Sequence, residues 1–154
     1  MTGIIETKES LQEIALRHLD DGVFMFDKDR KIVLFNPACE RIVGFSMEEI
    51  TENESNCFDI FRCHSSDKAC LSVCPGLDLF KEKRSRIARE YLIKTKEGKQ
   101  KRVITNYSII KDETYVVEYV VGVMRDITEE KLFNDELVRS KTLSTLGQYS
   151  NELA

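Results

Sequence analysis

Four cysteines lie close together in the middle of the chain, Cys57, Cys63, Cys70 and Cys74, in the pattern C-x5-C-x6-C-x3-C-P. Thiolates bind soft or borderline metals, and four of them can complete a tetrahedral shell or hold an iron–sulfur cluster. The final Cys-Pro also ends the familiar ferredoxin-type run, whereas the two-residue cysteine spacing of zinc knuckles is missing. We therefore expect these four cysteines to form one cofactor or metal site, with an iron–sulfur cluster as the leading interpretation.

The same four thiols are also compatible with three different roles. Reversible thiol–disulfide switching is one, because Arg62, His64 and Lys68 would favour the reactive thiolate. Zinc or another structural metal is a second, with His64 as a candidate substitute ligand. A third is that the cysteines serve only as small buried apolar residues. Cys39 lies apart from the others, and we expect it to be a core residue that faces the pocket.

Bulk composition narrows the class of protein that carries these thiols. The chain has 154 residues with 42% apolar content, which suits one domain with an appendage. A net charge of -4 provides no basic surface, so nucleic acid is not an expected partner. No run approaches the ~18 apolar residues of a membrane span, and the N-terminus has no signal-peptide core. We expect a cytoplasmic protein, whose five cysteines then indicate metal or redox chemistry before a disulfide framework.

The elements that position the cysteines begin with local helix and hairpin signals. Residues 7–20 have the apolar spacing of an amphipathic helix, and residues 22–27 and 31–35 form a β-hairpin around a short polar turn. Asn36 and Pro37 open a helix that Gly44 is placed to stop. Further on, Ser46 and Glu49 form a capping box, and residues 77–83 make one or two helical turns.

Three strands and a long helix follow the cysteine segment. Apolar and polar residues alternate over 88–94 and 102–110, and residues 115–124 are rich in valine and tyrosine, as strands are. A turn at Lys96–Gly98 joins the first two. Residues 128–154 hold no proline, and a helix of that length would span roughly 39 Å at ~1.5 Å per residue.

This order of elements resembles that of a PAS domain. The similarity covers roughly residues 16–130: the runs Gly22–Asp27 and Ile32–Pro37, then Gly44-Phe-Ser46, Lys96-Glu-Gly98 and the Asp-Ile-Thr exit at 126–128. The resemblance implies an α+β fold with a five-stranded antiparallel sheet, short helices on one face and a long C-terminal helix. Residues 1–20 would then be a flanking helix, 21–127 the sensor domain and 128–154 the signalling helix.

The PAS resemblance also places the cysteines where cofactors of this family usually sit, among the short helices that face the sheet. Some PAS domains hold an iron–sulfur cluster there and respond to oxygen or redox state. Flavin and haem fit less well, because Phe58-Asp-Ile-Phe61 replaces the flavin motif after Asn56-Cys57 and residues 77–83 hold no histidine. An organic ligand in an apolar pocket remains an alternative, with Phe24, Phe26, Tyr107 and Tyr119 as candidate lining residues.

The tail carries a second resemblance. Ser140–Gly147 and Asn151–Ala154 are similar to the start of a histidine-kinase dimerisation helix, and Leu143, Leu146, Ser150 and Leu153 fit a heptad spacing. The resemblance implies the sensory input module of a two-component histidine kinase, with a kinase domain downstream and a homodimer through the flanking helices. We expect no catalysis within this chain. The competing interpretation is a ligand-binding or dimerisation module whose cysteines are structural.

Overall fold

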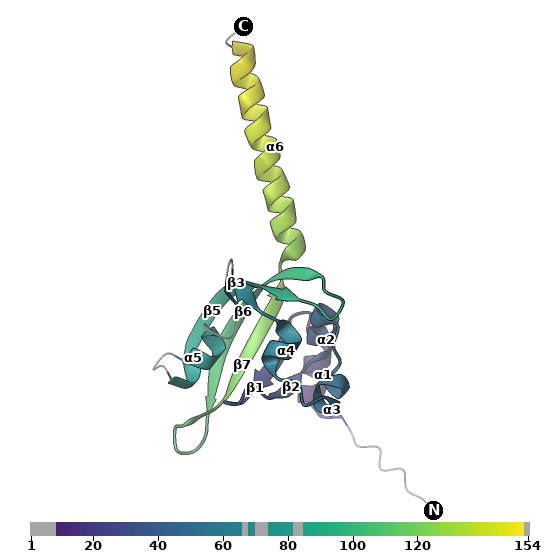
Figure 1. The fold of residues 1–154 in the computed structure, drawn as a ribbon, viewed down its shortest axis with the longest axis vertical. Helices are drawn as coiled ribbons and strands as arrows, with labels where there is room; N and C mark the ends of the chain where they lie inside the picture. The colour runs from purple at the N-terminus through teal and green to yellow at the C-terminus, as the bar shows by residue number, and fades with distance from the viewer. Residues whose placement is uncertain (1–8, 66–67, 70–73, 82–84, 153–154) are drawn as a thin grey trace, which may run out of the picture.

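The computed structural model describes residues 9–65, 68–69, 74–81 and 85–152 as an antiparallel sheet with helices on one side (Figure 1). The strands are β1 Gly22–Phe26, β2 Ile32–Phe35, β3 His64–Ser65, β4 Lys68–Ala69, β5 Arg86–Lys94, β6 Gln100–Lys111 and β7 Val117–Asp126. The helices are α1 Leu11–His18, α2 Pro37–Val43, α3 Met47–Glu52, α4 Cys57–Phe61, α5 Pro75–Lys81 and α6 Thr128–Glu152. The strand order is β2-β1-β7-β6-β5-β3-β4.

The five strands expected from the sequence are confirmed as β1, β2, β5, β6 and β7. Short helices lie against one face of this sheet, and α6 leaves the domain as a straight rod (Figure 1). The two-residue strands β3 and β4 extend the sheet beyond β5 and were not expected, because segments so short carry no alternation to detect. They lie within the cysteine segment, and β3 is next to β5.

Local capping chemistry fixes the helices between β2 and the cysteine segment. The Asn36 side chain accepts a hydrogen bond from the Cys39 backbone N–H, and Gly44 ends α2 with a φ of 84°. Ser46 and Glu49 form the expected capping box of α3. The same box recurs at α4, where Asn56 and Asp59 cap the first turn and Arg62 ends the helix in the left-handed region. Each of these short helices therefore begins and ends at residues with the matching capping chemistry.

The hydrophobic core fills the space between the helices and the inner face of the sheet. Phe24 and Phe26 on β1 are each 1% exposed, and the Phe24 ring packs 4.7 Å from that of Phe61 on α4. Gly122 on β7 lies directly against the Phe24 ring, where any Cβ would collide with it. The ring of Phe24 thus occupies the space that a side chain on the neighbouring strand would take.

The two flanking helices bury little. No residue of α1 is buried, and α6 exposes a series of large apolar side chains, Leu132, Phe133, Leu137, Val138 and Leu143. Leu153 lies outside the described residues, as do the side chains of Leu146 and Ser150, so the heptad there stays a prediction. Among the described helices, none is long and apolar enough to span a bilayer.

Candidate functional site

Helix α4 crosses the inner face of the sheet. It is attached near β2 and near β5, which are the outer strands of the five that the sequence predicted. At its start, the Cys57 backbone N–H donates to the Arg30 carbonyl at 2.9 Å, beside the edge strand β2. After its end, His64 pairs with Leu92 on β5, the opposite edge of the five expected strands. Cys57 and Cys63 therefore lie at the two ends of a segment held at both sides of the sheet.

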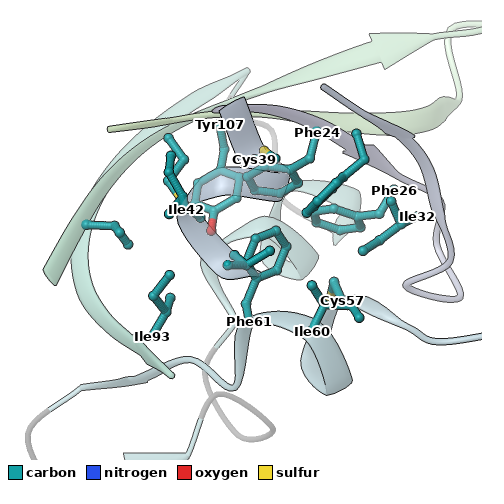
Figure 2. Packing of buried hydrophobic residues seen from close by; sticks show 14 of the residues in the cluster. Phe24, Phe26, Ile32, Cys39, Ile42, Cys57, Ile60, Phe61, Ile93 and Tyr107 are labelled. Atoms are coloured by element: carbon teal, nitrogen blue, oxygen red, sulfur yellow. The ribbon is translucent and has the colours of Figure 1, made fainter. Parts of the chain in front are cut away.

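Cys57 belongs to the hydrophobic core. Its side chain is 6% exposed and lies beside Ile60, below the rings of β1 (Figure 2). Its position as the first residue of α4 follows from the Asn56 cap. The structure thus places this thiol on the inner side, where the sequence analysis expected it.

Cys63 faces the inner side of the sheet from the β5 edge. His64 pairs with Leu92 in an antiparallel register, so the preceding residue, Cys63, is expected opposite Ile93. Residues opposite each other in an antiparallel pair point to the same face. Ile93 is fully buried and Tyr91, two residues away, is 8% exposed, so this is the core face. Cys63 itself is half-buried and packs against the core cluster.

A chain of three hydroxyl groups lies on this same face. The Tyr91 hydroxyl on β5 is 2.8 Å from Thr105 Oγ1 and 2.7 Å from the Tyr107 hydroxyl, both on β6. Thr105 is fully buried and Tyr107 is 5% exposed. In Figure 2 the Tyr107 ring extends from the sheet with its oxygen toward Phe61 of α4. A polar cluster therefore sits inside an otherwise apolar core.

Electrostatics connect this hydroxyl chain to two of the cysteines. Burial is the main cause that raises the pKa of Tyr91 well above 10.0, and the charge of the Cys63 thiolate is the next. For Tyr107, burial again raises the pKa first, followed by the charges of Tyr91 and Cys63. Cys74 adds to the rise in both tyrosines. Negative charge at Cys63 or Cys74 would therefore oppose the ionisation of both phenols.

The start of α5 brings Cys74 to this position. Cys74 is 8% exposed and directly precedes the helix, which begins at Pro75 rather than at the expected Leu77 because proline fits the first helical position. Gly76 lies against two aromatic rings: a Cβ there would be 2.6 Å from Phe26 Cζ and 3.3 Å from Tyr107 Cε1. Close packing of this glycine therefore seats the Cys-Pro-Gly turn beside Tyr107.

The remaining members of the predicted site are only partly described. Cys70 lies outside the described residues, and among those described no three His, Cys, Asp or Glu side chains gather as a metal-binding group. His64 Nε2 is 2.8 Å from Gln100 Nε2, and its Nδ1 is 3.3 Å from the Arg62 carbonyl. The convergence of the four cysteines stays a prediction.

The lining residues expected for a pocket divide between the two faces. Phe24, Phe26 and Tyr107 are buried on the inner face, as predicted. Tyr119 is a correction: it alternates with the fully buried Val120 on β7, so it points to the outer face, where Glu118 and other nearby groups raise its pKa. Tyr91 and Thr105 were missed, although the alternation of β5 and β6 already placed them on the same face as Tyr107.

Cys39 is a core residue, as expected, but in a different environment. It is fully buried on α2, and its Sγ would lie 2.7 Å from a Cβ added at Gly22 of β1. Burial raises the pKa of its thiol far above the ordinary value of 9.0. This thiol therefore fills space opposite a glycine and has no hydroxyl cluster beside it in the described core.

The junction between the sheet and α6 is tied by several hydrogen bonds. Asp126 accepts from the Thr128 backbone N–H at 3.0 Å and from its hydroxyl at 2.6 Å. Thr128 Oγ1 accepts from the Arg102 N–H at 2.9 Å, and Lys101 pairs with Asp126 at 3.3 Å. Although burial opposes it, this hydrogen bonding holds the pKa of Asp126 below its usual value. The first turn of α6 is thus fastened to β6.

A further ion-pair cluster joins β5 to α6. Glu90 lies 3.2 Å from the Arg102 guanidinium and 3.6 Å from the Lys131 ammonium on α6. It is the neighbour of Tyr91 along β5, on the opposite face of the strand. One strand therefore carries a side chain of the hydroxyl chain on its inner face and an anchor for the exit helix on its outer face.

The chain belongs to the PAS domain family, whose model matches residues 20–129. Solved structures with the same fold include a PAS domain from a two-component sensor histidine kinase, with 11% identity, a TM-score of 0.60, and coverage of 75% of this chain and 92% of that chain. A sensory box histidine kinase/response regulator from Burkholderia thailandensis E264 matches at 19% identity and a TM-score of 0.60, covering 88% of this chain and 98% of that one.

A third structure is a domain of a protein described as a putative light and redox sensing histidine kinase from Haloarcula marismortui. It is 22% identical with a TM-score of 0.56, and the match covers 76% of this chain and 97% of that one. At such identities the likeness concerns the fold. No curated protein sequence matches the chain.

Proposed function

We propose that this chain is the cytoplasmic sensory input module of a two-component histidine kinase and that its cysteine segment senses redox state or oxygen. The observation that carries the proposal is that half-buried Cys63 packs against the core at the β5 edge, while the buried Cys74 directly precedes α5, whose Gly76 packs against Tyr107. Reactive thiols lie in partly exposed, electropositive surroundings, and Cys63 stands between Arg62 and His64 in the sequence. The sensor histidine kinases among the structural neighbours support the choice of output.

An iron–sulfur cluster is the group that four thiolates would hold. Cys57, Cys63, Cys70 and Cys74 would be its ligands, and the cluster would supply one-electron redox chemistry. Among the described residues, no three candidate ligands gather. The cluster version therefore requires Cys57 and Cys70 to close around the other two.

Thiol–disulfide switching is the second candidate, with Cys63 and Cys74 as the proposed pair. Joining two thiols as a disulfide releases two protons and two electrons, which molecular oxygen or a peroxide would accept. Such a pair needs no further ligand. Both chemistries act on the same segment, and both would move the connection between α4, β3 and β5.

We propose that the signal reaches the kinase through β5 and α6. A change at Cys63 acts on β5 through the His64–Leu92 pairing, and Glu90 on that strand contacts Lys131 of α6. The kinase domain itself would follow α6, so no catalysis is assigned to this chain. Coupling of this kind needs two states separated by only a few kcal/mol.

We also propose that α6 pairs with α6 of a second copy. Leu132 and Phe133 are 59% and 63% exposed on α6, with Glu129, Glu130 and Glu136 nearby on the same helix. A helix that exposes large apolar residues near the point where it leaves its domain is suited to a two-helix interface. Sedimentation of the wild type and of Phe133→Glu tests this: a dimer that the substitution dissociates supports the pairing, and a wild-type monomer rejects it.

The decisive test of sensing is purification without oxygen, followed by absorption spectroscopy with iron and acid-labile sulfide assays. A coloured protein with stoichiometric iron and sulfide, lost on exposure to air, supports the cluster. A colourless protein that loses two titratable thiols reversibly on peroxide treatment supports the disulfide. If neither occurs, and Cys70→Ser with Cys74→Ser alters stability without altering kinase output, the cysteines are structural and redox sensing is rejected.

A further inference from the structure

The side chain of Asn36 is shared by four backbone groups. It is 3% exposed and lies where β2 ends and α2 begins. Its Oδ1 accepts from the Val23 N–H at 2.8 Å and from the Cys39 N–H at 3.0 Å. Its Nδ2 donates to the carbonyls of Leu16 and Asp21, both at 3.1 Å. One end of the amide faces two donors and the other faces two acceptors, so only this orientation satisfies all four groups.

Two of these hydrogen bonds cap two different helices. The Cys39 N–H lies in the first turn of α2, where amides have no partner within their own helix. The Leu16 carbonyl lies in the last turn of α1, where carbonyls are left over in the same way. Asn56 caps α4 in only the first sense: among the described residues, its Oδ1 accepts from the Phe58 and Asp59 N–H groups and its Nδ2 is not engaged. The amide at the start of α2 therefore joins two helices, whereas the one at the start of α4 serves one.

Helix α1 has little else that holds it against the domain. None of its residues is buried, and Leu11 and Ile14 are 82% and 39% exposed. A groove of about 480 Å³ lies between α1 and residues 34–37, so apolar packing on this side is incomplete. Arg17 forms its ion pair with Glu9, just before the helix, and not with the sheet. The hydrogen bonds from the buried amide are therefore a large part of what keeps α1 in place.

The connection between α1 and β1 also contacts the junction with α6. The Asp21 carboxylate receives two hydrogen bonds from the Arg125 guanidinium, at 3.2 Å and 3.3 Å. Two parallel bonds of this kind fix the geometry of an ion pair better than one does. Arg125 directly precedes Asp126, whose carboxylate accepts from the N–H of Thr128, the first residue of α6. Because β1 and β7 pair directly, the start of the one strand and the end of the other are neighbours.

We propose that Asn36 couples the two flanking helices: its amide keeps α1 docked beside α2, and loss of this contact is passed through Asp21 and Arg125 to the first turn of α6. Asn36 is a positioning residue in this scheme. The domain then responds to a displacement of α1 as well as to chemistry at the cysteine segment. The inference stands apart from the redox proposal, because no thiol group takes part in these contacts.

The first experiment measures how fast trypsin cleaves after Arg17 in native buffer, with cleavage after Lys101 in β6 as the reference for global unfolding. The variants are Asn36→Asp and Asn36→Ser, since both residues cap α2 as asparagine does but lack its amide donor, and serine adds no charge. We expect cleavage after Arg17 to become about tenfold faster in both, because proteolysis follows the population of the opened helix. The matched control Asn56→Asp should leave the rate unchanged. Equal rates in variants and wild type, or equal acceleration at both cleavage sites, would reject the docking role.

The second experiment follows the backbone amide signal of Thr128 by NMR. Asn36→Ser should shift this signal, and Asn56→Asp should not. Asp21→Asn removes a charge and one acceptor atom from the pair but keeps the carbonyl that accepts from Asn36. It should therefore leave cleavage after Arg17 within about twofold of wild type and abolish the response of Thr128 to Asn36→Ser. A Thr128 signal that does not move, or that moves equally with Asp21→Asn present, overturns the route to α6.

Discussion

Two cysteine environments in the same domain differ in what surrounds the sulfur. Cys39 is fully buried between α2 and Gly22, and burial raises the pKa of its thiol. Cys63 is half-buried at the edge formed by β3 and β5, on the face of β5 that carries Tyr91. Both cysteines face the inside of one sheet, but they differ in exposure and in the side chains on the neighbouring strand.

The comparison teaches that the neighbouring strand sets the surroundings of a thiol. Gly22 offers Cys39 an empty space, and the sulfur fills it as a methyl group would. The β5–β6 pair offers Cys63 a polar cluster within a dry core. A reactive thiol requires such polar company together with a path to reagents.

The largest expected difference between the two environments is chemical accessibility. Iodoacetamide should modify Cys63 at least about a hundredfold faster than Cys39, because Cys39 reacts only when the core opens. Peptide mass spectrometry over a time course in native buffer measures both rates in one sample. The ratio should collapse in urea, where both thiols are exposed. Comparable native rates would contradict the assignment of Cys39 to packing.

A second prediction tests whether the Cys39 sulfur fills the space opposite Gly22. Gly22→Ala places a Cβ 2.7 Å from the Cys39 sulfur and should lower the free energy of unfolding by about 1–3 kcal/mol. Adding Cys39→Ala should recover part of this loss, because it removes the sulfur that collides. Urea unfolding of the single and double variants measures the coupling. Additive losses would mean that the two residues do not share the space.

The buried tyrosines predict a pH dependence confined to the other environment. Their pKa values are raised in the folded protein, so the unfolded chain loses its phenol protons first, from pH 10.0 upward. The contribution of these tyrosines to stability should be constant well below that pH and should fall above it, by up to about 1.4 kcal/mol per pH unit for each tyrosine. In urea titrations, Tyr107→Phe should show a shallower fall than the wild type. Equal slopes would refute it.

The smallest expected effect concerns the ion pairs of Glu90, which connect β5 to α6. Glu90→Gln removes the charge that faces Arg102 and Lys131, and an exposed ion pair of this kind should change stability by less than about 1 kcal/mol. Amide hydrogen exchange should nevertheless increase in the first turn of α6, and added salt should reduce the difference from wild type. Glu97→Gln, in the β5–β6 turn, is the matched control.

The sequence predicted most of the fold because the relevant signals are local. Helix ends are predicted by the capping residues Asn36, Gly44 and Ser46. Alternation of apolar and polar residues predicts β5, β6 and β7. Strands β3 and β4 could not be found this way, since their two residues pair only because α4 delivers them to the β5 edge. Tertiary contacts decide such elements, and no sequence period records them.

The candidate site was predicted less completely for the same reason. The four cysteines are visible from their type and spacing, and Tyr107 from its place in a strand. The hydroxyl chain depends on the register that pairs Tyr91 with Val103 on β6, because alternation within a strand gives the face of a residue but not its partner. The position of Cys74 likewise requires Gly76 to pack on aromatic rings from distant strands.

The segment that contains α4 is attached near β2 at one end and to β5 at the other, and this has a mechanical consequence. A segment clamped at Arg30 on one side and at Leu92 on the other has a fixed span, so it cannot lengthen or shorten alone. Any shift of the backbone at Cys63 must change the curvature of the strands between those clamps. We therefore expect strands β2, β1, β7, β6 and β5 to bend together, so that a local sulfur event would deform the surface from which α6 departs.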